Sequence, residues 1–139
     1  AYHQQGQPFI DPATFPLVSV AATGTHDTET LAEWFDQLPA HERMAVGGTV
    51  GHFDARVRDI LVTRALTAGS AQAFLPMQDL FGWTDRINTP ATVGDHNWTW
   101  RLPWPIDAWA ATPEAQQRAA FCRRVKRPLT GIVRVRSAL

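Results

Sequence analysis

The sequence predicts an α/β fold built around two parallel strands, and three observations support this. The apolar run LVSVAA at residues 17–22 lies between Pro16 and Gly24 and is typical of a buried strand. A second strand is expected in AQAFLP at residues 71–76. The segment between the two runs has helical character. Strand, helices and strand then form a βαβ unit, so we expect parallel strands joined by a right-handed crossover.

Two short helices are expected directly after the first strand. One begins at Thr28, since acidic residues occupy its first turn and apolar residues recur at helical spacing through residue 38. Pro39 starts the next helix, and the pair Gly47 and Gly48 ends it.

Two longer helices follow. Asp54 caps the first, and Gly69 stands just past its end. Its apolar face consists of Val57, Ile60, Leu61 and Ala65. Thr112 caps and Pro113 opens the second, which ends near Pro128. A solvated face that complements the helix dipole explains the basic cluster in its second half. That cluster consists of Arg118, Arg123, Arg124, Lys126 and Arg127.

His26 and Asp27 lie between the first predicted strand and the helix that follows it. The segment PMQDLFGW at residues 76–83 follows the second strand. Parallel strands end at the same edge of a sheet, and active sites of α/β folds are built at that edge. We therefore expect the two segments to lie together in a site. The simpler interpretation is that Asp27 or Thr28 only caps the following helix.

Residues 82–109 form a long segment with little periodicity that carries five of the six tryptophans. Such loops are either functional or disordered, and the aromatic content argues against disorder. Aromatic faces next to amide, carboxylate and guanidinium groups suit a sugar-binding surface. The polar groups in question are Asp79, Arg86, Asn88, Asp95 and Asn97. In the alternative interpretation, the tryptophans hold the loop to the fold. We favour this alternative for Trp104 and Trp109 and leave both open for Trp98 and Trp100.

Composition excludes several classes of function. Acidic and basic residues balance at 13 each, so charge gives no reason to expect nucleic acid or a membrane surface as a partner. The chain has no apolar stretch of the roughly 20 residues that a membrane span needs. The single cysteine, Cys122, suits a reducing compartment, and we expect a cytoplasmic location. The opening at Ala1 reads as a surface loop, so we expect an excerpt from a longer protein.

A metal-dependent hydrolase that uses His26 and Asp27 is a further alternative. No other histidine or acid stands at ligand spacing from this pair, and His41, His52 and His96 lie in unrelated contexts. We therefore expect no metal and no cofactor.

Four motifs in order resemble the C-terminal part of the amylomaltases, the 4-α-glucanotransferases of glycoside hydrolase family 77. They are GTHD at 24–27, LPMQD at 75–79, RINTP at 86–90 and NWTWR at 97–101. The resemblance runs from about Gln7 to the helix after Thr112. It implies a (β/α)8 TIM barrel of which this chain supplies strands seven and eight with their helices and long βα loops. Residues 1–139 would then be the C-terminal segment of one catalytic barrel, with no separate second domain.

The resemblance also implies an activity, the retaining transfer of α-1,4-glucan segments between maltooligosaccharides. Three carboxylates act in that family, an aspartate nucleophile, a glutamate acid/base and a third aspartate. Asp27 matches the third and His26 the histidine beside it, while Asn88 matches a loop residue that faces the glucan. Asp79, Arg86 and Trp98 are our further candidates for substrate contacts.

The chain has no segment that matches the strands carrying the nucleophile or the acid/base. We therefore expect that it needs the N-terminal part of the barrel, is inactive alone, and is marginally stable or self-associating when isolated. The alternative from another class is a non-catalytic glycan-binding module that uses the tryptophan-rich loop.

Overall fold

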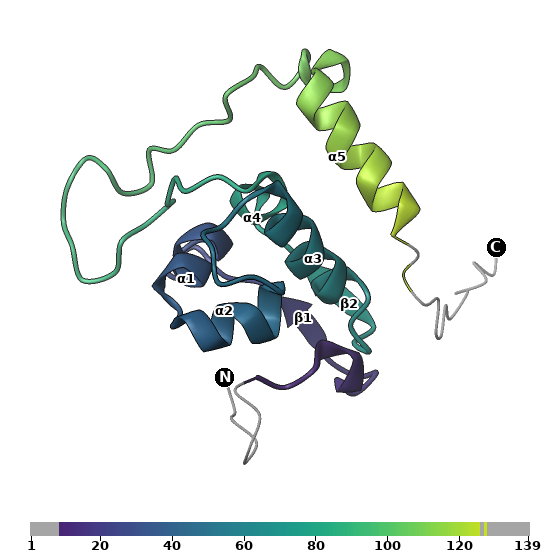
Figure 1. Cartoon of the computed structure of the whole chain (residues 1–139). Helices are drawn as coiled ribbons and strands as arrows, with labels where there is room; N and C mark the ends of the chain where they lie inside the picture. Colours follow the sequence, from purple (N-terminus) through teal and green to yellow (C-terminus); the bar gives the residue numbers. More distant parts are fainter. Residues whose placement is uncertain (1–8, 126, 128–139) are drawn as a thin grey trace.

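Two short strands, β1 (Val20–Ala22) and β2 (Gln72–Phe74), pair in parallel at the centre of the computed structural model, which describes residues 9–125 and 127 (Figure 1). The other elements are η1 (Pro12–Thr14), α1 (Leu31–Gln37), α2 (Ala40–Gly47), α3 (Ala55–Leu66), α4 (Met77–Phe81), η2 (Trp109–Ala111) and α5 (Pro113–Arg124).

The register of the pair aligns Ala21 with Ala73. The predicted parallel pairing is confirmed, but each strand is shorter than its apolar run. The reason lies at Leu17, whose carbonyl oxygen accepts hydrogen bonds from the amides of Ser19 (2.9 Å) and Ala71 (2.8 Å). The backbone therefore turns at residues 17–19, and only the residues after this turn pair with β2 as a strand.

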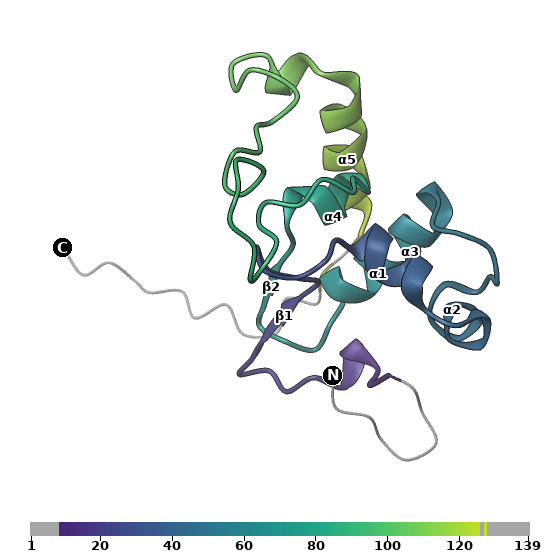
Figure 2. The ribbon, with the colours of Figure 1, turned by 90° about the vertical axis from the view of Figure 1, so that its left-hand side faces the viewer.

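Helices cover only one face of this sheet. Ala21 is buried, whereas the side chains that alternate with it remain open, with Val20 at 51% and Phe74 at 62% exposure. In Figure 2, α1, α2 and α3 lie together on one side of the strands, and α3 contacts β1. The prediction of a fully buried first strand is therefore wrong for this structure, since nothing among the described residues covers its second face.

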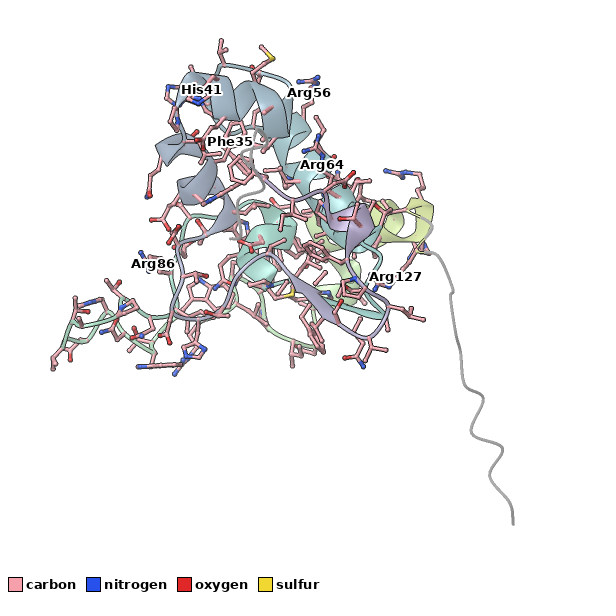
Figure 3. All side chains as sticks on the ribbon, turned by 90° about the horizontal axis from the view of Figure 1, so that it is seen from below. Phe35, His41, Arg56, Arg64, Arg86 and Arg127 are labelled. Atoms are coloured by element: carbon pink, nitrogen blue, oxygen red, sulfur yellow. The ribbon has the colours of Figure 1, made fainter. Side chains whose placement is uncertain are left out.

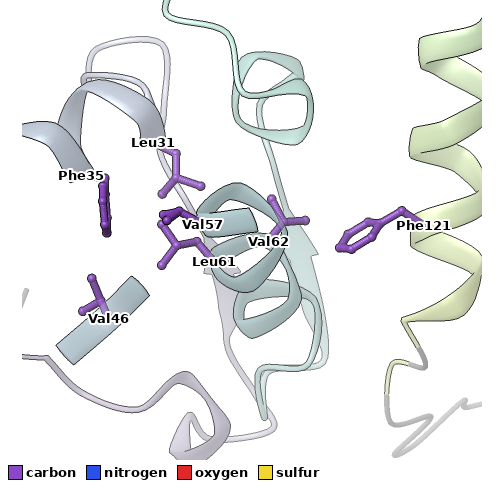
Figure 4. Close-up of a cluster of buried hydrophobic side chains, with 7 residues drawn as sticks. All are labelled: Leu31, Phe35, Val46, Val57, Leu61, Val62 and Phe121. Carbon is purple, nitrogen blue, oxygen red and sulfur yellow. The ribbon is translucent and has the colours of Figure 1, made fainter. Parts of the chain in front are cut away.

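A hydrophobic core joins the helices. Phe35 of α1 is fully buried and lies close to Gly47 at the end of α2, where an added Cβ would stand 2.6 Å from the phenyl ring. Glycine at this position lets the ring pack against the helix backbone. Figure 4 shows Val57 and Leu61 of α3 in the same cluster. Its buried members are Leu31, Phe35, Val46, Val57, Leu61, Val62 and Phe121.

The capping residue of α1 differs from the expected one. Thr30 accepts a hydrogen bond at its Oγ1 from the Glu33 amide (3.3 Å), and the Glu33 carboxylate accepts one from the Thr30 amide (3.1 Å). This reciprocal capping box starts the helix at Leu31. The interpretation that Asp27 or Thr28 caps the helix is therefore wrong, and Asp27 is left free for another role.

Two further predicted helix boundaries in this region are confirmed. Helix α2 ends at Gly47, followed by Gly48 in the left-handed conformation. Asp54 caps α3 by accepting a hydrogen bond from the Val57 amide at 2.8 Å. Gly69, in contrast, does not end α3, whose C-cap is Thr67.

Gly69 has a different role, close approach of two chain segments. An added Cβ would lie 2.3 Å from the Phe15 carbonyl oxygen, and the Gly69 amide donates to the Pro12 carbonyl at 3.0 Å. The glycine therefore lets the segment after α3 pass directly against η1.

The buried face of α3 differs from the predicted one at two positions. Val57, Leu61 and Ala65 are buried as expected, but Ile60 is only half-buried. Val62 is fully buried instead. In Figure 4 its side chain points toward Phe121 of α5, which packs against α3 from the side opposite Phe35.

Two arginines that the sequence pattern placed on a solvated face contact α3 instead, one on α5 and one beyond its end. Arg118 is only 11% exposed, its Nη1 lies 2.7 Å from the Asp59 carboxylate, and its guanidinium stacks 4.6 Å from the centre of the Phe121 ring. Arg127 donates from Nη1 to the Leu66 carbonyl at 2.9 Å. The solvated interpretation is wrong for these two residues.

The ends of α5 depart from the predictions in smaller ways. Thr112 stands at the N-cap position, but its hydroxyl donates to the Ala108 carbonyl (3.1 Å) and caps no helix amide. The helix ends at Arg124, and both Lys126 and Pro128 lie outside the described residues. Arg123 and Arg124 are exposed, as expected.

A hollow of about 840 Å³ lies beside β1, between η1 and the helices. Its walls are largely apolar and include Phe15, Ala21, Leu31, Trp34 and Leu61. Together with the open face of the sheet, it leaves much apolar surface uncovered by the described residues.

We predict that Asp59 stabilises the attachment of α5 in a pH-dependent way. Burial alone would raise the pKa of its carboxyl, but the hydrogen bonds and charges of Arg118 and Arg58 outweigh this and hold the pKa below its ordinary value of 3.8. A carboxyl with a lowered folded-state pKa stabilises the fold above its ordinary pKa, and this contribution disappears as the pH falls through the lowered pKa.

Asp59→Asn should therefore speed amide hydrogen exchange in α5 at pH 7 by up to about fivefold, equivalent to about 1 kcal/mol for a partly exposed ion pair. The difference from the wild type should close as the pH falls below 3.8. Asp107→Asn, on an exposed residue, is the control. Equal exchange in wild type and variant at pH 7 would contradict the prediction.

Candidate functional site

His26 and Asp27 occupy the two central positions of a tight turn that directly follows β1. The Thr28 amide donates to the Thr25 carbonyl (3.4 Å), and the Thr25 amide donates to the Thr28 hydroxyl (2.8 Å), so residues 25 and 28 close the turn from both sides. The two central side chains are half-exposed, at 51% and 52%. His26 Nε2 lies 3.1 Å from Asp27 Oδ2.

The loop after β2 meets this turn, as the parallel strands predicted. Asn88 Nδ2 donates to Asp27 Oδ1 at 2.7 Å, although the two residues are 61 positions apart. Arg86 Nη2 lies 3.4 Å from the main-chain oxygen of Asp27. Figure 3 shows Arg86 on the side of the molecule from which the long loop projects. Four polar side chains from two loops therefore gather at one edge of the sheet.

Trp98 adds an aromatic surface to this cluster. Its ring centre lies 5.0 Å from that of His26, with the planes inclined by 45°, and the residue is 60% exposed. The backbone of Trp98 is held by its amide, which donates to the Ile87 carbonyl at 2.8 Å. An exposed ring beside a carboxylate, an amide and an imidazole offers an apolar face and hydrogen-bonding groups to one ligand.

The other four tryptophans of the loop pack among themselves. Trp83 stacks on Phe81 of α4 at 4.5 Å between ring centres, and Trp100 and Trp104 lean on Trp83 at 5.9 and 5.6 Å. Trp109 meets Phe81 and Trp104 edge-on. The interpretation that Trp104 and Trp109 hold the loop is confirmed, and Trp100 has the same role. Trp98 stands apart from this cluster.

Asn97 also serves the loop itself. Its Oδ1 accepts a hydrogen bond from the Thr89 amide (2.8 Å), and its Nδ2 donates to the Thr92 carbonyl (3.0 Å). The amide group therefore ties together the two ends of the excursion between residues 89 and 97. This arrangement places the neighbouring Trp98 beside His26.

Asp79 is placed differently from the rest of the predicted site. It lies on α4, a short helix that the sequence pattern did not reveal, and is only 2% exposed. Thr23 Oγ1 donates to its Oδ2, and the Leu31 amide donates to its Oδ1 at 2.7 Å. Burial raises the pKa of the Asp79 carboxyl despite these two hydrogen bonds. Both oxygens of its carboxylate are therefore held by donors within the fold.

A small cavity of about 20 Å³ lies between α4 and the turn, with His26, Gln78, Asp79 and Arg86 among the residues that line it. Gln78 Nε2 and Arg86 Nε are buried and have no hydrogen-bond partner among the residues that the structure describes. In the same part of the chain, no group of three or more His, Cys, Asp and Glu side chains is placed to hold a metal ion. None of the described helices is long and apolar enough to cross a membrane.

Comparison with known proteins decides the family. The family model of glycoside hydrolase family 77, described as 4-alpha-glucanotransferase, matches residues 1–107. The chain belongs to this 4-alpha-glucanotransferase family. The expected resemblance is thereby confirmed, although the match ends before η2 and α5.

Relatives of the family come from plants and bacteria. The chain is 34% identical over 107 residues to the chloroplastic/amyloplastic 4-alpha-glucanotransferase of Oryza sativa subsp. japonica, a match that covers 75% of this chain and 18% of the relative. Identity to the chloroplastic/amyloplastic enzyme of Solanum tuberosum is 35% (60% of this chain, 15% of the relative), and to the 4-alpha-glucanotransferase of Synechocystis sp. it is 29% (76% and 21%). The chain thus spans about a fifth of the length of these relatives.

A solved structure shares the fold. The amylomaltase from Streptococcus agalactiae in complex with acarbose aligns with a TM-score of 0.63 and 24% sequence identity, over 82% of this chain and 22% of that chain. Since that protein is an amylomaltase, the α/β arrangement of this chain is that of part of a 4-alpha-glucanotransferase fold.

We predict that Trp98 and Trp104 differ in their effect on stability. Trp104→Ala should lower the free energy of unfolding by about 2 kcal/mol, because the ring packs against Phe81, Trp83 and Trp109. Trp98→Ala should change it by less than about 1 kcal/mol, since most of the ring is exposed. Urea denaturation of the two variants checks this, and equal losses would show that Trp98 is also a packing residue.

Proposed function

We propose that this chain is part of the catalytic domain of a 4-α-glucanotransferase and supplies its third carboxylate, Asp27. The observation that carries the proposal is the meeting of Asp27 with Asn88, from two different loops, at the carboxyl edge of a parallel sheet. Family membership gives the class of reaction, and the half-exposed carboxylate has the accessibility that a substrate contact requires.

The proposed reaction is retaining transfer by two displacements. A nucleophilic carboxylate and an acid/base carboxyl about 5 Å apart carry out the covalent steps through an oxocarbenium-like transition state. Asp27 assists by accepting hydrogen bonds from the 2- and 3-hydroxyls of the sugar at the scissile bond. Because these bonds strengthen as the sugar ring flattens, they lower the barrier and do not merely bind the substrate.

The neighbours of Asp27 suit this role. Asn88 holds Oδ1 and His26 lies beside Oδ2, which fixes the plane of the carboxylate while each oxygen keeps a lone pair for a hydroxyl. His26 can donate to the same hydroxyls. Trp98 offers a sugar face to stack on, and Arg86 supports the turn through the main-chain oxygen of Asp27.

We further propose that β1 and β2 are strands seven and eight of a (β/α)8 barrel. The uncovered face with Val20 and Phe74 would then line the barrel interior, and the hollow beside β1 would receive the preceding part of the barrel. The nucleophile and the acid/base would come from that part, so the 139 residues alone would lack transfer activity. The single cysteine supports a reducing, cytoplasmic location.

The proposed substrates are maltooligosaccharides and longer α-1,4-glucans such as starch, glycogen and maltodextrin. A glycan-binding module without catalysis is less well supported. Most tryptophans of the loop are engaged with Phe81 and with one another, which leaves Trp98 as the exposed ring of that loop.

Incubation of the complete protein with maltotriose tests the function. Transfer should yield both glucose and maltodextrins longer than maltotriose, resolved by anion-exchange chromatography. Glucose and maltose alone would instead indicate a hydrolase, and binding without turnover would indicate the glycan-binding module.

We predict a graded effect of substitutions at the turn. Asp27→Asn should lower kcat by at least about 100-fold with little loss of folding, since the charge that stabilises the transition state is removed while the Asn88 contact can persist. His26→Ala should lower kcat and donor binding by a smaller factor. Turnover of maltotriose and circular dichroism of both variants check this. An Asp27→Asn protein that keeps most of its activity would contradict the assignment.

A further inference from the structure

We infer that Asp79 is a positioning residue that holds the catalytic turn by both of its ends. The inference rests on the proposed function, because the turn is the one that carries Asp27. In this role Asp79 acts through the turn and not directly on the sugar. It is buried beneath residues 24–30, and its two carboxylate oxygens are taken by protein donors.

The two donors mark the boundaries of the loop. Thr23, which donates to Oδ2, is the first residue after β1, and Leu31, whose amide donates to Oδ1, is the first residue of α1. A single carboxylate on α4 thus joins the end of one strand to the start of the next helix. Residues 24–30 span the distance between these two fixed points.

Between those points the loop is already stiff. The Thr25–Thr28 turn is closed by main-chain and hydroxyl hydrogen bonds, and the capping box of Thr30 and Glu33 fixes its exit. Because a stiff loop moves as a rigid unit, the hydrogen bonds at its two ends determine the positions of His26 and Asp27. Asp79 supplies a bond at each end.

The loop also lies directly over the carboxylate. An added Cβ at Gly24 would stand 3.6 Å from Asp79 Oδ2 and 2.7 Å from Thr28 Oγ1. The backbone at Gly24 thus lies next to Asp79, and the closest approach that requires glycine here is to Thr28 within the loop. Few alternative positions for the turn are left while the carboxylate keeps both partners.

The burial of Asp79 is consistent with this role. Burial raises the pKa of its carboxyl, and the hydrogen bonds from Thr23 and the Leu31 amide act in the opposite direction. Two hydrogen bonds from donors at the two ends of the loop need two acceptor atoms on one side chain, and a carboxylate supplies both. An apolar residue could fill the space but would leave Thr23 and the Leu31 amide without these partners.

The experiment compares four variants of the complete protein: Asp79→Ala, Asp79→Asn, Thr23→Val and the exposed control Asp107→Asn. Each is measured for kcat and KM with maltotriose and for amide hydrogen exchange of residues 24–31. Asparagine keeps an acceptor for the Leu31 amide and a polar partner for Thr23, so it is the conservative rescue. Thr23→Val removes one end of the clamp and retains the shape of the side chain.

Asp79→Ala should lower kcat about 100-fold with a smaller change in KM, since a displacement of about 1 Å is enough for such a loss. Exchange in residues 24–31 should quicken at least tenfold. Thr23→Val should show both effects more weakly, Asp79→Asn should restore most of the activity, and Asp107→Asn should match the wild type. If Asp79→Ala does not fold, Thr23→Val and Asp79→Asn still decide the matter.

Two results would overturn the inference. One is unchanged exchange in residues 24–31 for Asp79→Ala or, if that variant does not fold, for Thr23→Val. The other is an Asp79→Asn protein whose loop exchanges like the wild type but whose kcat falls as far as that of Asp27→Asn, because the charge itself would then act on the sugar. If the wild type transfers no glucan, the proposed function fails, while the exchange measurements still test whether Asp79 holds the turn.

Discussion

The structure depends on the parallel pairing of two three-residue strands. Strands this short give little stability by themselves, and the helices that pack on one face must hold them together. The parallel pairing makes both strands run in the same direction, so that the segments after them start at the same edge of the sheet. It brings Thr23 and α4 to the same edge, so that one buried carboxylate can reach both ends of the loop after β1. The exposed cluster around Asp27 is built on top of that arrangement.

The loop after β2 divides its aromatic and amide residues between two tasks. Trp83, Trp100, Trp104 and Trp109 build a packed cluster on Phe81 that anchors the loop. The side chain of Asn97 is hydrogen-bonded to the backbone of Thr89 and Thr92 and so stabilises the outer part of the loop. With this support in place, Trp98 can remain exposed in a left-handed backbone conformation (φ 63°) beside His26. Such a conformation is tolerated when surrounding bonds determine it, as the Ile87 carbonyl does here.

Features that follow from local sequence or strand direction could be predicted. Asp54 as a cap and the approach of the segment 76–83 to the turn that carries His26 and Asp27 belong to this class. The position of Asp79 could not be predicted, because the sequence around an acidic residue after a strand does not show whether its side chain faces a ligand or the interior. Helix α4 turns it inward, and a five-residue helix is too short to show periodicity.

The same limit applies to the basic end of α5. An arginine in the second half of a helix can be solvated or can form an ion pair, and the helix sequence is the same in both cases. Only the position of Asp59 on α3 shows that Arg118 forms an ion pair.

Helix α5 also affects where a boundary can be placed in this fold. The family match stops at residue 107, yet Phe121 belongs to the core and Arg118 bridges to α3. A boundary at the end of the family match would remove α5, which covers Val62. A chimera or truncation made at that boundary would expose an apolar, aggregation-prone surface on α3.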